Sequence, residues 1–349
     1  MNQFINYYNR TKKLIKKEIE LVNIELLKEN NPYVQENMKV FGELNKNGKL
    51  IRGILITLGY YFKNENIAYS IPLAASYELF QTSVLVHDDI IDKALYRRGR
   101  TTINNYNALK YQKLEDNIHL GNSIALCIGD YNLNYVIMKM VNDYANDPNL
   151  TKLLQIYTSI VSKTIKGQII DVILPCEEKS EKNVSNLEEH ILKIYTNKTA
   201  YYTIIGPLVM GMTLSGCTPK EIEEINKVAL PLGIAFQIQD DLLDIFSDKN
   251  DIGKPVGNDI SEFKQTLLYA YTKNTNYYSN LLNYYGKENF DVKKVQEIFI
   301  NSGAKKYCED KMNELYLESL NSLDNIKWLN NNSKNILKDF IYYLNSRDK

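Results

Sequence analysis

Residues 71–93 read IPLAASYELFQTSVLVHDDIIDK, and residues 230–246 read LPLGIAFQIQDDLLDIF. Both stretches are apolar with a period near 3.6 residues, which predicts helices that are largely buried. Each stretch nevertheless contains a group of three aspartates near its end. In the first group Asp88 and Asp92 are four residues apart, so they share one face of the predicted helix. A buried helix with a carboxylate face needs a partner of opposite charge.

The second stretch repeats this spacing with Asp240 and Asp244. Burying an unpaired carboxylate costs a large free energy, and like charges four residues apart repel each other. Two such groups in apolar helices therefore require cations. Ligands that offer only oxygen favour a hard cation, and Mg²⁺ usually shares its ligands with the phosphates of a substrate. A single aspartate-rich helix end could simply face solvent, but two copies behind apolar runs make this interpretation much weaker.

The rest of the chain has the same helical period, and no alternation typical of strands persists, so the sequence predicts an all-α fold. Because no linker-like change of composition divides the chain, residues 1–349 are expected to form a single domain. The main expected helices cover 54–61, 71–93, 122–144, 150–174 with an end at Pro175, 187–215, a stretch from Pro219, 230–246 and 260–344. Residues 330–335 are expected to form a loop.

The composition argues against several classes of protein. The 349 residues include 42 Lys and Arg and 42 Asp and Glu, so the formal charge is zero, and nonspecific binding to nucleic acid is not expected. No run of about 18 apolar residues is present to span a membrane. The charged N-terminal segment lacks the apolar core of a signal peptide, and the four cysteines form no C-x-x-C pair. These features predict a cytoplasmic protein with reduced thiols.

Basic residues accompany both aspartate groups along the chain. Arginine and lysine are the usual ligands of phosphate, and a Gly-Lys loop adds backbone amides and a mobile ammonium group. Metal-binding acids and phosphate-binding bases in one helical chain indicate a diphosphate held by Mg²⁺. The basic positions are Gly48-Lys49-Leu-Ile-Arg52, Arg97-Arg98-Gly99, Lys198-Thr199, Gly253-Lys254 and Lys264.

In this combination the motifs resemble those of the trans-isoprenyl diphosphate synthases (polyprenyl synthetases), from about Phe41 to Lys349. The resemblance implies a helical bundle of the isoprenoid synthase type around a central cavity. Leu50 and Gly53 depart from the family's common Lys-Arg-Leu-Arg-Pro form. The two aspartate-rich motifs are Asp88-Asp-Ile-Ile-Asp92 and Phe236-Gln-Ile-Gln-Asp-Asp-Leu-Leu-Asp244. Further family-like segments are Gly167-Gln168-Ile-Ile-Asp171, Lys198-Thr199-Ala200, Asp259 to Thr266 and the basic tail Arg347-Asp-Lys349.

The resemblance also implies ligands and a role for single residues. The substrates would be isopentenyl diphosphate and an allylic diphosphate, and the cofactor would be Mg²⁺, with about three ions per active site. The implied metal ligands are Asp88, Asp92, Asp240 and Asp244. The implied ligands of isopentenyl diphosphate are Lys49, Arg52, Gln81 and Arg98. Those of the allylic diphosphate are Arg97, Lys198 and Lys254, with Lys264 at the edge of the site. Thr199 and Gln237 would line the reacting centre, so the implied catalytic set is Lys198, Thr199, Gln237 and Lys254.

The length of the product depends on the space along the first aspartate helix. The growing prenyl chain is expected to run from Asp88 towards the helix N-terminus, where Ser83 is roughly 7.5 Å and Phe80 roughly 12 Å away along the axis. The small side chain at the nearer level favours geranylgeranyl diphosphate, with farnesyl or longer products as alternatives. Ordinary packing roles for these residues also remain open. The candidate pocket residues are Phe80, Ser83 and Val84, with Tyr131 or Tyr135 as a floor on a facing helix.

Two other functions compete with this interpretation. A terpene cyclase would share the fold and the first motif, but such enzymes usually carry Asn, Ser and Glu in the second motif. This chain has aspartates there, and it also has Lys49 and Arg52. A non-catalytic subunit of a heteromeric synthase would tend to lose the aspartates, and all six are present. Members of the family generally form homodimers, so a homodimer is expected.

Overall fold

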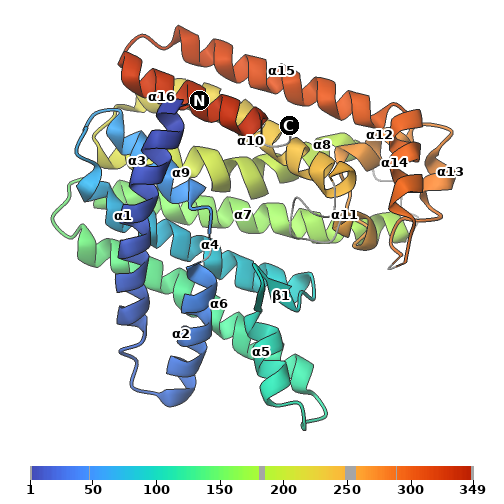
Figure 1. The fold of residues 1–349 in the computed structure, drawn as a ribbon, viewed down its shortest axis with the longest axis horizontal. Coiled ribbons are helices and arrows are strands. Elements are labelled where there is room, and N and C mark those ends of the chain that lie inside the picture. The colour runs from blue at the N-terminus through green and yellow to red at the C-terminus, as the bar shows by residue number, and fades with distance from the viewer. Residues whose placement is uncertain (1, 47, 181–184, 248–256, 288, 347–349) are drawn as a thin grey trace. The chain divides into compact units, whose positions relative to one another are not determined.

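The computed structural model describes residues 2–46, 48–180, 185–247, 257–287 and 289–346, and they form an almost entirely helical structure (Figure 1). The predicted all-α class is therefore confirmed. The α-helices are α1 Asn2–Leu26, α2 Pro32–Asn45, α3 Ile51–Tyr61, α4 Ile71–Ile91, α5 Ile103–Lys110, α6 Asn117–Asp143, α7 Leu150–Lys179, α8 Leu187–Ile194, α9 Gly206–Leu214, α10 Pro219–Phe246, α11 Asn258–Ser261, α12 Leu267–Lys273, α13 Tyr278–Leu281, α14 Val292–Asn301, α15 Ala304–Asn325 and α16 Asn331–Asn345. A 3-10 helix covers Ile67–Ser70, and a π-helix covers Tyr195–Ile205.

Contacts divide the chain into two compact units. The first, called the α4 unit here, contains Ile5–Ile156 and Pro207–Cys217. The second, called the α10 unit, contains Met1–Phe4, Tyr157–Gly206 and Thr218–Lys349. Each unit carries one of the two aspartate groups. The expectation of a single domain remains a prediction.

The α4 unit is built around α4, which packs against α3 and α6. The helices α3 and α9 approach each other at two glycines. A Cβ atom at Gly211 would lie 1.9 Å from the carbonyl oxygen of Ile56, and one at Gly59 would lie 2.3 Å from that of Leu208. Both distances are far below van der Waals contact, so the two backbones pack directly because neither glycine has a side chain.

The α10 unit is built around α10, which packs against α15 and the π-helix. This helix begins with a capping box, in which the Thr218 hydroxyl accepts a hydrogen bond from the Glu221 N–H and the Glu221 carboxylate accepts one from the Thr218 N–H. Pro231 lies inside α10, so the stretch expected from Pro219 and the one at 230–246 are a single helix.

Two predicted boundaries are wrong. Pro175 was expected to end a helix, but α7 continues to Lys179. A proline removes one backbone hydrogen bond, and the other bonds of this 30-residue helix hold the turn together. Residues 330–335 were expected to form a loop, but Asn330 is the N-cap of α16, and its side chain accepts from the Ser333 N–H at 2.8 Å.

A short hairpin also interrupts the helical pattern. The strands β1 (Tyr96–Arg97) and β2 (Arg100–Thr101) pair antiparallel between α4 and α5. They are too short to produce an alternating sequence pattern, which is why none was predicted.

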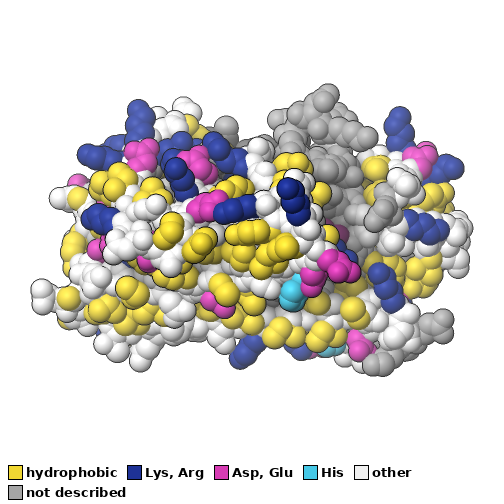
Figure 2. Space-filling model, turned by 90° about the horizontal axis from the view of Figure 1, so that it is seen from below, with side chains coloured by type: hydrophobic (Ala, Val, Ile, Leu, Met, Phe, Trp, Pro, Cys, Tyr) yellow, Lys and Arg dark blue, Asp and Glu magenta, His cyan; other side chains and the backbone are white. Residues whose placement is uncertain are grey.

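The surface carries mixed charge, as the neutral composition suggests. Figure 2 shows positive and negative side chains interspersed with apolar ones on the face that it presents. Within the described ranges, no helix has both the length and the apolar character needed to cross a bilayer. All four cysteines are free.

Candidate active site

The first aspartate group lies at the C-terminal end of α4. Asp88 is in the last turn of the helix, and Asp92 follows the final helical residue, with its N–H donating to the Asp88 carbonyl at 2.8 Å. The C-terminal end of a helix carries partial negative charge, which makes carboxylates there unfavourable. The geometry therefore increases the need for cations that the sequence already indicated.

The hairpin supplies one of these cations. Arg98 and Gly99 form its two-residue turn, and both have positive φ angles, 54° and 74°. Two left-handed residues in succession are typical of a tight type I′ turn. The turn directs the Arg97 guanidinium towards α4, where Nε donates to the carboxylate of Asp89 and Nη2 lies 3.5 Å from Oδ2 of Asp88.

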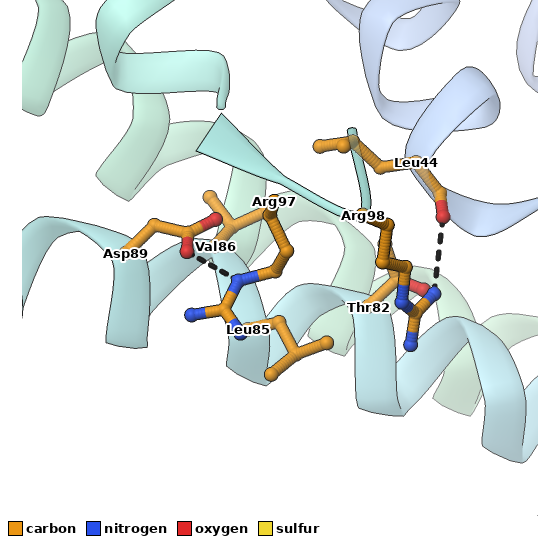
Figure 3. Close-up of a pocket in the computed structure, with 7 residues that line it drawn as sticks. All are labelled: Leu44, Thr82, Leu85, Val86, Asp89, Arg97 and Arg98. Carbon is orange, nitrogen blue, oxygen red and sulfur yellow. Dashed lines mark hydrogen bonds and ion pairs between the residues drawn. The ribbon is translucent and has the colours of Figure 1, made fainter. Parts of the chain in front are cut away.

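Arg98 is directed away from this group. Its Nη1 donates to the Leu44 carbonyl at 3.1 Å, near the end of α2, as Figure 3 shows. The two adjacent arginines thus lie in different regions. Arg97 is beside the aspartates of α4, and Arg98 is beside the start of α3. The division of the two arginines between two diphosphates stays a prediction.

A buried glutamate organises the region around Arg98 and the start of α3. Glu78 lies on α4 with 2% of its surface exposed, and its Oε1 accepts from the Gly53 N–H at 2.7 Å. Gly53 is in the first turn of α3, where backbone N–H groups lack partners within the helix. Burial raises the pKa of the Glu78 carboxyl, and the charges of Arg52 and Arg98 oppose that rise. Glu78 therefore caps α3 and faces two predicted ligands of isopentenyl diphosphate.

The sequence interpretation missed Glu78. The available signal was one acidic residue inside the apolar run of α4, well before the aspartates. The contact also explains why proline, which is common in the family at this position, does not suit position 53. The Gly53 N–H is a donor to Glu78, and proline has no N–H to donate. The other two predicted ligands of isopentenyl diphosphate are Lys49, which is exposed, and Gln81, which is partly buried on α4.

The second aspartate group lies near the C-terminal end of α10. Asp244 accepts through Oδ2 from the Asp259 N–H at 3.0 Å, at the start of α11. Lys264 Nζ lies 3.8 Å from Oδ1 of Asp259 and 2.7 Å from Oε2 of Glu262. Burial raises the pKa of Asp244, and it raises that of Asp259 to about 7 because nearby acidic groups add to the effect despite Lys264.

Lys198 and Thr199 lie on the π-helix of the same unit. Lys198 Nζ is 2.5 Å from Oδ2 of Asp171 on α7, and the Thr199 hydroxyl donates to Oε1 of Gln237 on α10 at 2.6 Å. Two glycines allow this close packing. A Cβ at Gly167 would lie 2.7 Å from the backbone nitrogen of Lys198, and one at Gly233 would lie 2.5 Å from the Ala200 Cβ. The structure thus brings together three predicted residues, Lys198, Thr199 and Gln237.

The donor chemistry of both aspartate groups fits Mg²⁺. All the predicted ligands are carboxylate oxygens, which a hard divalent cation prefers. Burial and neighbouring acidic groups raise the pKa of Asp244 and of Asp259 in the α10 unit. In the described part of the chain, no group of three or more His, Cys, Asp or Glu side chains is placed to hold a metal ion alone. Mg²⁺ held by one or two carboxylates usually keeps several waters and shares its remaining positions with substrate phosphates.

The remaining predicted residues are those of the second Gly-Lys loop, the basic tail and the chain-length pocket. Lys254 and the tail Arg347–Lys349 lie outside the described residues. Phe80 and Ser83 are fully buried and Val84 is partly buried. The pocket beside Arg97 and Arg98 is lined on α4 by other residues, namely Thr82, Leu85, Val86 and Asp89 (Figure 3). The chain-length assignment therefore stays a prediction.

Carboxylate groups with basic partners in an all-α fold suit the binding of a metal–diphosphate complex. A family model described as "Polyprenyl synthetase" matches residues 34–301. The chain therefore belongs to the polyprenyl synthetase family and is a trans-prenyltransferase.

Relatives with different products resemble this chain to a similar degree. It is 27% identical over 318 residues to farnesyl pyrophosphate synthase of Candida albicans, with 86% of each chain covered. It is 28% identical over 247 residues to a short chain isoprenyl diphosphate synthase of Methanocaldococcus jannaschii, covering 70% of this chain and 69% of the relative. With octaprenyl diphosphate synthase of Escherichia coli it shares 27% identity over the same coverage. These names do not determine the product of this chain.

A solved structure supports the fold. Geranylgeranyl pyrophosphate synthase from Corynebacterium glutamicum, in complex with isoprenyl diphosphate and magnesium, has a TM-score of 0.85 at 24% identity. The comparison covers 98% of this chain and 99% of that protein.

We predict that Glu78→Gln weakens binding of isopentenyl diphosphate selectively. The variant keeps the side-chain size but removes the charge beside Arg52 and Arg98. The KM for isopentenyl diphosphate should rise about tenfold, while the KM for the allylic substrate and kcat change less than about twofold. Steady-state kinetics measures all three, and Glu36→Gln, which removes a surface partner of Lys110, is the matched control. An unchanged KM for isopentenyl diphosphate would contradict the assignment.

Proposed function

We propose that this prenyltransferase condenses isopentenyl diphosphate with an allylic diphosphate, head to tail, to give a longer all-trans prenyl diphosphate, with Mg²⁺ as cofactor. The carrying observation is that each aspartate group has a basic partner beside it. In the α4 unit, Arg97 contacts Asp88 and Asp89. In the α10 unit, Lys264 lies beside Asp259, whose backbone N–H donates a hydrogen bond to Asp244. Carboxylates next to phosphate-binding cations suit a metal–diphosphate complex.

In the proposed reaction, basic residues bind the diphosphates and acidic residues hold Mg²⁺. Arg97, Lys198 and Lys254 bind the allylic diphosphate and stabilise the negative charge that grows on its oxygens as the allylic C–O bond breaks. Asp88, Asp92, Asp240 and Asp244 would hold about three Mg²⁺ ions, which supply further charge stabilisation when bound. Lys264 lies at the edge of this diphosphate site.

The second substrate supplies the electrons for the new bond. Lys49, Arg52, Gln81 and Arg98 bind the diphosphate of isopentenyl diphosphate, which orients its double bond towards the allylic cation. The double bond attacks, a carbon–carbon bond forms, and one proton leaves to the departing diphosphate. Holding both substrates in this geometry and excluding water account for much of the acceleration.

Product analysis tests the proposal directly. The purified protein is incubated with Mg²⁺, isopentenyl diphosphate and, in turn, dimethylallyl, geranyl or farnesyl diphosphate, and the dephosphorylated products are separated by chromatography. The expected result is chain extension that requires both substrates and stops when the metal is chelated. Consumption of geranyl or farnesyl diphosphate alone would instead indicate a cyclase. Activity that appears only with a second protein would indicate a subunit of a heteromeric synthase.

We further propose geranylgeranyl diphosphate as the main product, and we predict that Ser83→Phe shortens it. Ser83 is fully buried one turn before the aspartates, and its hydroxyl donates to the Leu79 carbonyl at 2.9 Å. A benzyl group there would occupy the space proposed for the chain. Ser83→Ala, which stays small, should leave the product unchanged. If folded Ser83→Phe, checked by thermal denaturation, makes products of the original length, the pocket assignment is wrong.

We also propose a homodimer, because α6 exposes several large apolar side chains: Leu126, Tyr131, Met138 and Val141. Burying such side chains against a second copy would be favourable. Sedimentation velocity should give twice the chain mass, and Met138→Glu should shift the population towards the monomer. A monomer at all accessible concentrations would rule this out.

The proposed cytoplasmic location can be checked by cell fractionation, where recovery outside the cytosol would contradict it.

A further inference from the structure

The middle aspartate of the second group is oriented differently from its neighbours. Asp241 is only 6% exposed, whereas Asp240 and Asp244 are partly exposed on α10. Both oxygens of Asp241 accept hydrogen bonds from protein side chains. Oδ1 accepts from Nε2 of Gln237 at 2.7 Å, and Oδ2 accepts from the hydroxyl of Tyr195. Both oxygens of Asp241 therefore have hydrogen-bond partners inside the protein.

The contact with Asp241 orients the Gln237 amide. Its Nε2 donates to Oδ1 of Asp241 at 2.7 Å, and an ionised carboxylate oxygen can only accept, so the ionised form of Asp241 fixes the NH₂ group in this direction. The amide oxygen is then left to face Thr199, whose hydroxyl donates to it at 2.6 Å. A hydroxyl has one proton and two lone pairs, and this contact uses the proton. The Thr199 oxygen therefore presents lone pairs, not a proton, to any other group that approaches it.

Tyr195 connects the same carboxylate to two further segments. It is the first residue of the π-helix that carries Lys198 and Thr199, and its phenolic oxygen accepts from the Leu267 N–H at 3.1 Å. Leu267 begins α12. Asp241 thus links α10, the π-helix and the start of α12 inside the α10 unit.

We propose that Asp241 is a positioning residue and not a metal ligand. It orients Gln237 so that Thr199 offers an electron-rich oxygen to the reacting centre, where it stabilises the positive charge that develops on the allylic carbon. The inference rests on the proposed function, because only a cationic centre gives the direction of the Thr199 hydroxyl a catalytic consequence. Charge that develops in the reaction is stabilised best by dipoles oriented in advance.

The test compares Asp241→Leu, which removes both acceptor oxygens at similar size, with Asp240→Asn. Asp241→Leu should lower kcat about tenfold or more and leave the half-saturating Mg²⁺ concentration within about twofold. Asp240→Asn should raise the Mg²⁺ requirement about tenfold. Calorimetric titration of Mg²⁺ with inorganic diphosphate gives the same comparison without turnover. Asp241→Asn, which keeps one acceptor oxygen, should give a smaller loss of kcat and serves if the leucine variant does not fold.

A double-mutant cycle distinguishes positioning through Thr199 from a general structural role. In a Thr199→Val background the hydroxyl is absent, so Asp241→Leu should cost little additional kcat. Additive losses would overturn the inference, as would a shift in Mg²⁺ binding equal to that of Asp240→Asn. If the wild-type protein shows no condensation at all, the proposed function fails. If it condenses but the losses are additive, only this inference fails.

Discussion

The structure depends on the placement of carboxylates where a protein normally avoids them. Asp88 and Asp92 lie at the negative end of the α4 dipole, and Asp244 lies beside the partly buried Asp259. Each of these arrangements is unfavourable without cations. The α4 group has the guanidinium of Arg97, and the α10 group has the ammonium of Lys264 near Asp259. Each group still has more carboxylates than basic neighbours, and this excess of negative charge favours a metal cation bound together with a diphosphate.

Acidic side chains also lie beside the basic groups. Glu78 caps α3 and faces Arg52 and Arg98, so these basic groups have an acidic neighbour before any substrate binds. Asp171 does the same for Lys198 at 2.5 Å. The π-helix that carries Lys198 packs tightly on its neighbours because glycines face it at positions 167 and 233. Preorganised groups of this kind lose less entropy when a ligand binds.

Much of this could be predicted from the sequence because the signals are local. The helical period and the four-residue aspartate spacing predicted α4, α10 and the clustering of acids and bases. The continuation of α7 past Pro175 was missed, since local propensity underrates what tertiary packing tolerates. The Asn330 cap was missed because asparagine is typical of loops as well as of helix N-caps. Glu78 and the partners of Asp241 were missed because their meaning depends on contacts between distant residues, such as Gly53 and Tyr195.

The central claim is that the aspartate groups bind Mg²⁺ together with diphosphate, and thermal denaturation of the folded protein tests it most directly. Melting temperatures are compared with Mg²⁺ alone, inorganic diphosphate alone and both together. A ligand that binds only the native state raises the melting temperature. The account predicts a large increase only when both are present, and loss of that increase in Asp88→Asn and equally in Asp240→Asn. An increase with diphosphate that needs no metal, or one that survives either substitution, would contradict it.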